Sequence, residues 1–547
     1  MCAFVVSGKS LDTMAAEVKP TITKEAEKKC SSLSSLTADV PKASPLEEQF
    51  ARLLYGTKWF RLILAGLSGI MLILAFPPFD QSALIWFALL PLLLSIFSAP
   101  TIVQAGLSGL ITGIVFYSFS LSFFIGRFGV IGLFIGNLLS VYLALFAVSV
   151  WFVTLRWGLK AGVLLTPIIW SGIEYFRSEC YILKFSWLAL GYSQHNNLTI
   201  IQVCDLIGVY GLSFIIVIIN ALISWFILEI IRRKRVKWWS LITAGVILGT
   251  VLISGIIKIS RVMNKPLASS PNALKAVVIQ ENIGSLDRYI ELTRQVVSDG
   301  EGRTIVAWPE AGESDVLYNS EDLKKVVWLV KEKKIYLVVG TIEPTGKPIR
   351  FNNFAVLFAP NGEILGAYAK RTTVQFVENI IEPGTEVGVY QTPLGKVGIL
   401  ICYEMGFTAD TREVITNGAS LLVIPTLEIN PSLLGKLEHI HHASMAPFRA
   451  IETRRFIIRP AAFGISQIVH PSGLVQGQLN YLTTGSIQTI VTTKNLLTFY
   501  IRAGYLLPII LMYFYAVLMV VNIVLWLKTI LPVRIRTQTG IQKKLSV

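Results

Sequence analysis

Long apolar runs fill the first half of the chain and follow one another with only short polar interruptions. A helix that crosses a membrane needs about 20 mostly apolar residues, and eight runs approach that length. Seven lie in the N-terminal half, whereas the eighth stands alone near the C-terminus. We therefore expect a membrane α-helical bundle of about eight transmembrane helices. The runs lie at 60–78, 83–99, 102–124, 129–153, 161–176, 207–230, 240–259 and 503–527.

A different pattern separates the seventh run from the eighth, because short β-branched runs alternate there with segments of helical period. Strand-like runs at 274–283 and 336–344 flank a helix-like segment at 322–335. An Asn-Gly turn predicts a hairpin within 352–370. Strands that alternate with helices, with added hairpins, predict an α/β layered domain. The other predicted elements are strands at 303–313, 397–404 and 418–426, a helix at 444–456 and a second hairpin at 463–477.

The composition supports a chain divided between membrane and water. Hydrophobic residues make up 53% of the 547 residues and charged residues only 15%, whereas soluble domains have about 25% charged residues. The first residues are polar and have little periodicity, which is typical of disorder. The predicted organisation is a disordered cytoplasmic tail at 1–55, a transmembrane bundle at 56–261, a layered domain at 262–500, a C-terminal transmembrane helix at 501–530 and a basic cytoplasmic tail at 531–547.

Basic residues cluster in three segments outside the apolar runs. They occur in "RRKRVK" at 232–237, around Arg156 and Lys160, and in the tail 531–547. Lysine and arginine are enriched in cytoplasmic loops, so this distribution predicts cytoplasmic termini and an exported segment 262–500. The net charge of +15 is explained by these membrane flanks. No nucleic-acid motif accompanies it, so we expect a lipid bilayer and no nucleic acid among the partners.

Potential metal ligands are few in this sequence. Only Cys402 of the five cysteines falls within 262–500, and the absence of a Cys-x-x-Cys pair argues against a zinc or redox site. His439, His441 and His442 form a group, but their spacing places at most two of them on one helical face, and no carboxylate pattern completes a site. We therefore predict no metal and no cofactor.

Three predicted strands of the exported segment end in reactive residues: Glu310, Lys370 and Cys402. Taken singly, Glu310 is typical of a hydrogen-bond acceptor in a turn, Lys370 of a solvated lysine and Cys402 of an inert cysteine in a core. Together they form a set for nucleophilic catalysis, because a thiol is reactive only as the thiolate. A carboxylate can remove the proton, and an ammonium group stabilises the thiolate and then the oxyanion of a tetrahedral intermediate.

The order Glu–Lys–Cys, in "WPE" (308–310), "YAK" (368–370) and "CYE" (402–404), resembles the nitrilase (carbon–nitrogen hydrolase) superfamily. Together with the membrane spans on both sides, "LALGYSQ" (188–194) and "FRAIETRRF" (448–456) make residues 60–528 similar to the apolipoprotein N-acyltransferase family. The resemblance implies an exported αββα sandwich between the bundle and the last helix.

The resemblance also implies roles for single residues. Cys402 would be the nucleophile, Glu310 the general base and Lys370 the positive group at the oxyanion. Glu378 in "VQFVE" would assist the lysine or the proton transfer. Tyr403 and Glu404, which follow the nucleophile, would shape the substrate pocket. The residue types at these positions match the family motif.

The implied reaction is a ping-pong acyl transfer through a thioester on Cys402. The acyl donor would be the sn-1 chain of a membrane phospholipid. The acceptor would be the α-amine of the diacylglyceryl-cysteine at the N-terminus of a bacterial apolipoprotein. The implied location is the bacterial inner membrane, with the catalytic domain facing the periplasm.

Two other functions use the same features. A membrane-tethered amidase or nitrilase would keep the three catalytic residues and use water as the acceptor. A transporter with a degenerate accessory domain would need charged or broken helices around a site at the membrane midplane, and the apolar runs contain little charge. The eight-span layout weighs against the amidase, because simple hydrolases of this superfamily are usually soluble. The intact Glu–Lys–Cys set weighs against the transporter, so the acyltransferase is favoured over both.

The chain departs from the resemblance in two segments. After Lys370 it reads "KRTTVQFVE" without the usual His, Pro and Gly, so residues 371–377 differ from the family pattern. Residues 425–432 read "PTLEINPS" and lack the usual Trp, and Glu428 occupies a position where a small or polar residue is expected. The departures affect specificity or rate, and they leave the three core roles filled.

Overall fold

The computed structural model describes residues 45–180, 184–232, 238–263, 270–282, 285–299, 302–430 and 434–544. Most of the predicted tail 1–55 lies outside these residues, as do positions 233–237 of the basic segment and 545–547 of the C-terminal tail. Where the N-terminal tail is described, it forms α2 (Pro45–Gly56), and Leu54 is fully buried. This part of the tail is therefore packed against the bundle and not irregular.

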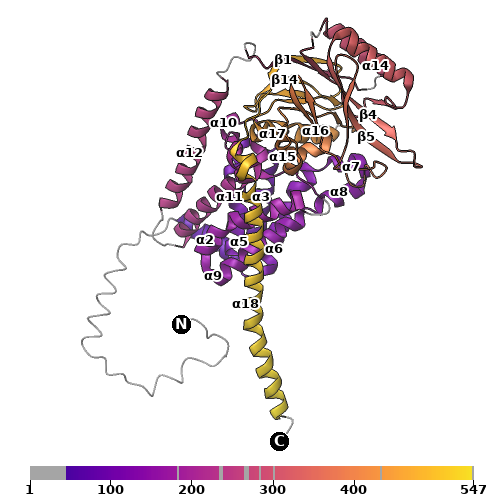
Figure 1. The fold of residues 1–547 in the computed structure, drawn as a ribbon. Helices are drawn as coiled ribbons and strands as arrows, with labels where there is room; N and C mark the ends of the chain where they lie inside the picture. The colour runs from indigo at the N-terminus through magenta and orange to yellow at the C-terminus, as the bar shows by residue number, and fades with distance from the viewer. Residues whose placement is uncertain are drawn as a thin grey trace, which may run out of the picture.

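Helices cover all eight predicted apolar runs (Figure 1). Six helical segments are long and apolar enough to cross a membrane. The second run is shorter, Ser82–Ser98, and consists of a 3-10 turn followed by α4 (Ile85–Ala88) and α5 (Leu90–Ser98). The six long segments are α3 (Lys58–Ala75), α6 (Ile102–Ser120), Val130–Cys180, α11 (Cys204–Ile231), α12 (Trp238–Met263) and Tyr500–Lys528, which begins α18 (Leu506–Lys544).

The long segment Val130–Cys180 turns back on itself. It contains α8 (Val130–Asn137) and α9 (Ser140–Tyr175), and within α9 Gly158 has φ 84° and ψ 168°. A Cβ on Gly162 would lie 2.0 Å from Oγ1 of Thr154, although eight residues of continuous helix span about 12 Å. The two arms of α9 therefore correspond to the fourth and fifth predicted spans. The total of eight crossings stays a prediction, because length and composition alone identify six.

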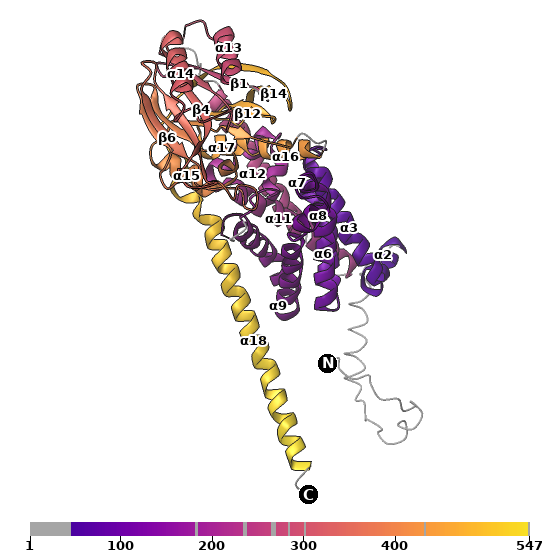
Figure 2. The same cartoon turned by 90° about the vertical axis from the view of Figure 1, so that its right-hand side faces the viewer.

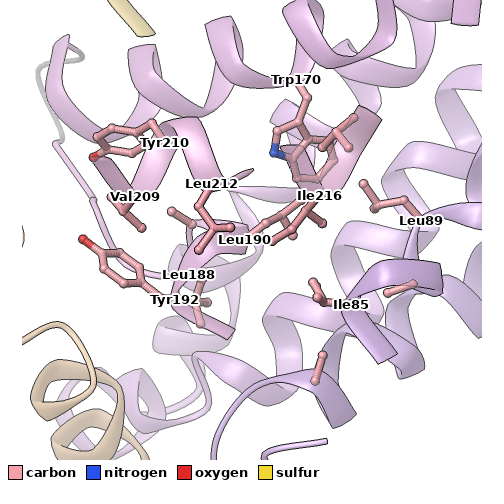
Figure 3. Close-up of a cluster of buried hydrophobic side chains, with 14 of the residues drawn as sticks. Ile85, Leu89, Trp170, Leu188, Leu190, Tyr192, Val209, Tyr210, Leu212 and Ile216 are labelled. Carbon is pink, nitrogen blue, oxygen red and sulfur yellow. The ribbon is translucent and has the colours of Figure 1, made fainter. Parts of the chain in front are cut away.

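Buried side chains from α9, α11 and the segment before α5 form the centre of the bundle, as Figure 3 shows for Trp170, Leu212 and their neighbours. The break between α4 and α5 leaves backbone groups without helical partners. Asn220 of α11 satisfies them: its Oδ1 accepts from Leu89 N at 3.0 Å, and its Nδ2 donates to the Ile85 carbonyl at 3.0 Å. A broken helix is tolerated inside a membrane only when its backbone groups find such partners.

The domain between α12 and α18 contains two mixed sheets. Their central strands are parallel, β1–β2–β4 in one sheet and β8–β9–β11 in the other, and antiparallel hairpins extend both. The first sheet has the order β15 (Gly485–Thr492), β1 (Ala273–Gln280), β2 (Thr304–Ala307), β4 (Tyr336–Pro344), β5 (Phe351–Phe358), β6 (Ile364–Ala369), with β3 (Glu313–Ser314) beside β4. The second has the order β14 (Val475–Leu479), β13 (Ser466–Val469), β11 (Ile457–Arg459), β9 (Leu421–Val423), β8 (Gly395–Ile399), β7 (Val389–Thr392). A separate two-stranded sheet is formed by β10 (Thr426–Leu427) and β12 (Ala461–Ala462).

The two sheets pack face to face, and helices cover their outer faces. Alternate residues of a strand point to opposite faces, so Val278 lies between the sheets while Val277 packs outward. α13 (Leu286–Val296) and α14 (Ser320–Lys333) cover the first sheet, whereas α15 (Thr408–Thr416) and α17 (Ala446–Thr453) cover the second; α16 (Gly435–Ala443) leads into α17. The predicted αββα sandwich is confirmed.

The layer of α15 and α17 rests directly on the bundle (Figures 1 and 2). Glu179 at the end of the α9 segment accepts a hydrogen bond from Thr408 N at 2.9 Å. Glu452 of α17 accepts one from Val209 N at 2.9 Å, where Gly208 (φ 67°) interrupts α11. A single hydrophobic cluster runs from the bundle into these helices, so the layer of α15 and α17 and the bundle helices share one core.

Helix packing in the bundle predicts an asymmetry between two glycines. A Cβ on Gly109 of α6 would lie 2.2 Å from the Leu143 carbonyl oxygen of α9, whereas nothing lies within 4 Å of a Cβ on Gly245 of α12. Gly109→Ala should therefore separate α6 from α9 and reduce stability by about 1–3 kcal/mol. Gly245→Ala should leave it unchanged or raise it. Thermal unfolding of the detergent-purified proteins measures both, and equal midpoints would contradict the packing.

Candidate active site

Strand direction brings Glu310 and Lys370 to the same edge of the first sheet. Glu310 follows β2, and Lys370 follows β6 directly. Because β5 is antiparallel to both β4 and β6, β6 runs parallel to β2 and β4. Their carboxyl ends therefore share one edge, where α/β folds place their chemistry. Cys402 follows β8 of the facing sheet, so the contacts described below close the site between the two sheets.

Lys370 is fully buried and lies between two carboxylates. Its Nζ donates to Glu310 Oε1 at 2.8 Å and to Glu378 Oε1 at 2.6 Å. Burial lowers the pKa of Lys370, but the negative charges of Glu310 and Glu378 outweigh burial, so the pKa lies above its ordinary value. Lys370 is therefore charged, and the predicted base and the assisting glutamate bind the same ammonium group.

Asn353 is a residue that the sequence reasoning missed. Its Nδ2 donates to Glu310 Oε1 at 2.7 Å from β5. The signal was a pair of asparagines, Asn352 and Asn353, at the start of a strand whose later residues are apolar. Asn353 is 2% exposed, and a buried amide at such a position requires a polar partner.

Cys402 occupies a strained position at the sheet edge. Its φ is +50°, an uncommon value for a residue other than glycine, and its N–H donates to the Pro425 carbonyl at 2.8 Å. Its Sγ lies 3.7 Å from the Leu427 carbonyl oxygen, and Leu427 N donates to Glu310 Oε2 at 2.8 Å. Leu427 thus connects Cys402 with Glu310, the predicted base.

The thiol of Cys402 has a perturbed acidity. Burial, followed by the negative charge of Glu310, raises the pKa of Cys402 well above its ordinary value, and the ammonium of Lys370 opposes this. The resting thiol is therefore protonated at neutral pH and needs a base in order to react.

Glu404 lies outside the wall of the cavity described below, and its hydrogen bonds join two segments of the site. It is fully buried, and its carboxylate accepts from Tyr368 OH at 2.8 Å, Arg371 N at 2.7 Å, Thr372 N at 3.0 Å and Ile401 N at 2.7 Å. Burial raises the pKa of Glu404 to about 7. These bonds tie the turn of Cys402 to the loop of Lys370, so Glu404 holds both segments in place. Its role in shaping the substrate pocket stays a prediction.

Tyr403 and Glu378 do line the cavity. The hydroxyl of Tyr403 donates to the Lys184 carbonyl at 2.6 Å and so connects the nucleophile's turn to the membrane side. Glu378 Oε2 accepts from Val374 N at 2.7 Å. This bond closes the loop after Lys370 on itself, even though the loop lacks the His, Pro and Gly of the family pattern.

A cavity of about 780 Å³ opens beside Cys402. Glu310, Glu378 and Tyr403 also line it. Most of its wall is apolar, and α7 (Phe123–Phe128), α8, the start of α9 and the segment 374–381 all contribute to it. Apolar residues of this wall include Phe123, Phe124, Phe128, Ile135, Leu138, Leu139, Phe185, Trp187, Phe376 and Ile380.

The three histidines are not arranged as metal ligands. Among the residues that the structure describes, no three His, Cys, Asp or Glu side chains are grouped so that they could hold a metal ion. His439 and His442 both face the carboxylate of Glu428. His441 packs against Phe76 in the bundle, and burial lowers its pKa to about 3.

Comparisons with known proteins agree with both halves of this architecture. The family model for the apolipoprotein N-acyltransferase N-terminal domain matches residues 68–222, and the model for carbon–nitrogen hydrolase matches residues 274–496. A protein of Geobacter metallireducens named apolipoprotein N-acyltransferase is 28% identical over 487 residues, which cover 81% of this chain and 91% of that protein. Proteins of the same name from Thermotoga maritima and Haemophilus influenzae are each 24% identical, over 81% and 80% of this chain and 90% and 89% of their own lengths.

The two charges beside Cys402 should shift its titration in opposite directions. Alkylation by iodoacetamide reports the thiolate, so its rate should still rise with pH above 9 in the natural protein. Glu310→Gln removes a negative charge and should move the profile to lower pH, whereas Lys370→Met removes a positive charge and should move it higher. Peptide mapping of Cys402 measures each rate. Lys347→Met, at an exposed surface lysine, is the control, and identical profiles in all variants would contradict the assigned contacts.

Proposed function

Because the chain belongs to the apolipoprotein N-acyltransferase family of the nitrilase superfamily, we propose that it N-acylates the N-terminal diacylglyceryl-cysteine of bacterial apolipoproteins. The acyl donor is the sn-1 chain of a membrane phospholipid. A thioester on Cys402 carries the chain between the two substrates. The enzyme is an acyltransferase and a multi-pass membrane protein.

One observation carries this proposal: the cavity that reaches Cys402 is walled mainly by apolar side chains, and part of this apolar wall comes from α7, α8 and the start of α9 in the membrane bundle. Moving an acyl chain out of an apolar environment costs about 0.8 kcal/mol per CH₂ group. A site that opens toward the membrane helices avoids that cost for both lipid substrates. A small hydrophilic amide would have no use for such a wall, so the acyltransferase is favoured over a tethered amidase.

In the first half-reaction, Glu310 takes the proton of the Cys402 thiol, and the sulfur attacks the ester carbonyl of the donor. The ammonium of Lys370 and the N–H of Tyr403 stabilise the resulting oxyanion. The N–H groups of the first residues in a helical turn have no acceptor within the turn, and Tyr403 is the second residue of the 3-10 turn Cys402–Gly406. The tetrahedral intermediate expels the lysophospholipid alkoxide, which takes the proton from Glu310, and leaves the thioester.

In the second half-reaction, the neutral α-amine of the acceptor attacks the thioester carbonyl. Glu310 accepts a proton from the attacking nitrogen, and the same oxyanion donors act again. The C–S bond breaks, the amide is released, and the thiolate of Cys402 recovers the proton from Glu310. The apolar wall keeps water away from the thioester between the two steps.

The catalytic domain faces the periplasm in this proposal, and the membrane is the bacterial inner membrane. The basic positions Arg156 and Lys160 flank the turn of the α9 hairpin, far along the bundle from the sandwich (Figure 2). The α18 helix also leaves the sandwich and runs past the bundle in the same direction (Figure 1). Both features support cytoplasmic basic ends and an exported sandwich.

Intact mass spectrometry tests the acyl-enzyme. After incubation with a phospholipid, the protein should gain one fatty-acyl mass that hydroxylamine removes, and Cys402→Ala should gain none. Addition of a diacylated lipopeptide should then clear the adduct and acylate the peptide. Absence of an adduct with every phospholipid tried, together with turnover of a small amide or nitrile, would assign the chain to the amidases instead.

Cysteine labelling tests the orientation. Lys347→Cys on the sandwich and Lys160→Cys at the α9 turn are placed in a chain whose Cys2, Cys30 and Cys180 are serine. A membrane-impermeant maleimide should modify the first before the inner membrane is lysed and the second only afterwards. The reverse order would place the sandwich in the cytoplasm.

A further inference from the structure

Glu428, one of the residues that depart from the family pattern, is the centre of a buried charged cluster behind Cys402. Its Oε1 lies 2.6 Å from Arg459 NH2 and 2.7 Å from His442 Nδ1, and its Oε2 lies 3.1 Å from His439 Nδ1. All four side chains are at most 3% exposed. Gly464 leaves room for the carboxylate, since a Cβ there would lie 1.9 Å from Glu428 Oε2.

The cluster reaches the nucleophile through the imidazole of His442. Its Nε2 lies 3.2 Å from the carbonyl oxygen of Cys402. The ring also stacks on Trp187, with ring centroids 5.6 Å apart and planes inclined by 19°. His442 and Trp187 both line the acyl cavity. The ring is therefore held on one face by an aromatic residue and at both nitrogens by polar atoms.

The contacts of His442 determine which nitrogen carries a proton. A carbonyl oxygen can only accept, so the Nε2 contact requires a proton on Nε2. The charged ring satisfies both contacts, because Nδ1 then donates to Glu428 Oε1 at 2.7 Å and Nε2 donates to the Cys402 carbonyl at 3.2 Å. A neutral ring protonated at Nε2 keeps the bond to Cys402 and accepts from Arg459 NH2 at 3.1 Å, but its Nδ1 lone pair faces Glu428. A neutral ring protonated at Nδ1 sets its Nε2 lone pair against the Cys402 carbonyl. The charged ring, next to the Glu428 carboxylate, is therefore the state in which His442 donates to Cys402 without a lone-pair conflict.

The hydrogen bond from His442 fixes the orientation of a catalytic peptide group. The carbonyl of Cys402 and the N–H of Tyr403 belong to one planar trans peptide and point in opposite directions. When His442 holds the carbonyl, the N–H of Tyr403 is turned away from the cluster. Cys402 has a positive φ, so this orientation has a conformational cost that an external bond must offset.

We propose that His442, oriented by Glu428 and Arg459, is a positioning residue that aims the Tyr403 N–H at the oxyanion formed on the Cys402 thioester. This rests on the proposed function for the identity of the acyl donor, whereas the positioning itself applies to any ester that acylates Cys402. Glu428 thereby has a role in a position where the family pattern has a small or polar residue.

Two reactions of the same thiol separate positioning from general damage. Acylation by p-nitrophenyl octanoate forms an oxyanion, whereas alkylation by iodoacetamide does not. His442→Phe keeps a ring against Trp187 and loses the donor, so it should slow acylation at saturating ester by about 10-fold or more. Its KM and its alkylation rate should stay within about 2-fold of the natural protein. His442→Gln retains an N–H donor and should recover much of the acylation rate.

His441→Phe is the matched control, because it changes the neighbouring buried histidine on the same helix without touching Cys402. It should leave both reactions unchanged, and Glu428→Gln should weaken acylation less than His442→Phe. Equal losses of acylation and alkylation in His442→Phe, or no loss of either, would overturn the positioning role. Normal acylation by the p-nitrophenyl ester with none by phospholipids would contradict the proposed donor and would still support the role of His442.

Discussion

The site depends on one buried ammonium group. Lys370 binds Glu310 and Glu378, and its side chain is fully shielded from solvent. An isolated charge in such a place would cost several kcal/mol. Neither the lysine nor the carboxylates can therefore occupy their positions alone. The end of β2, the end of β6 and the loop 371–381 are tied together by this requirement. The charges of Glu310 and Lys370 then act in opposite directions on the pKa of Cys402.

The second constraint is the shared core of sandwich and bundle. Buried carboxylates such as Glu179 and Glu452 bond to backbone N–H groups across the boundary, and the hydrophobic cluster passes through it without interruption. The cavity beside Cys402 lies at the same boundary, since its wall is supplied by residues of both the membrane helices and the sandwich. In the proposed function the membrane helices therefore contribute to the substrate site as well as to the anchor.

Much of this could be predicted from the sequence because it depends on local patterns. Apolar runs located the helices, and strand ends identified Glu310, Lys370 and Cys402. Contacts between distant segments could not be predicted. The burial of Glu404 and its bonds to the Lys370 loop depend on the approach of β8 to β6, and the role of Asn353 depends on strand pairing. In the sequence His442 is one member of a histidine group. Its contact with Cys402 forms only when the chain folds, so the sequence could not reveal it. The reversal of α9 at Gly158 was visible only as a basic gap between two apolar runs.

The pairing of β1 with β15 has a consequence for how the protein is made. Residues 273–280 pair along their whole length with residues 485–492, so the first strand of the sandwich has its outer neighbour near the domain's end. During synthesis β1 emerges long before that neighbour does. Until β15 arrives, β1 is an open sheet edge that can pair with other chains. Delivery of the last strand is thus the step that protects the growing domain from aggregation.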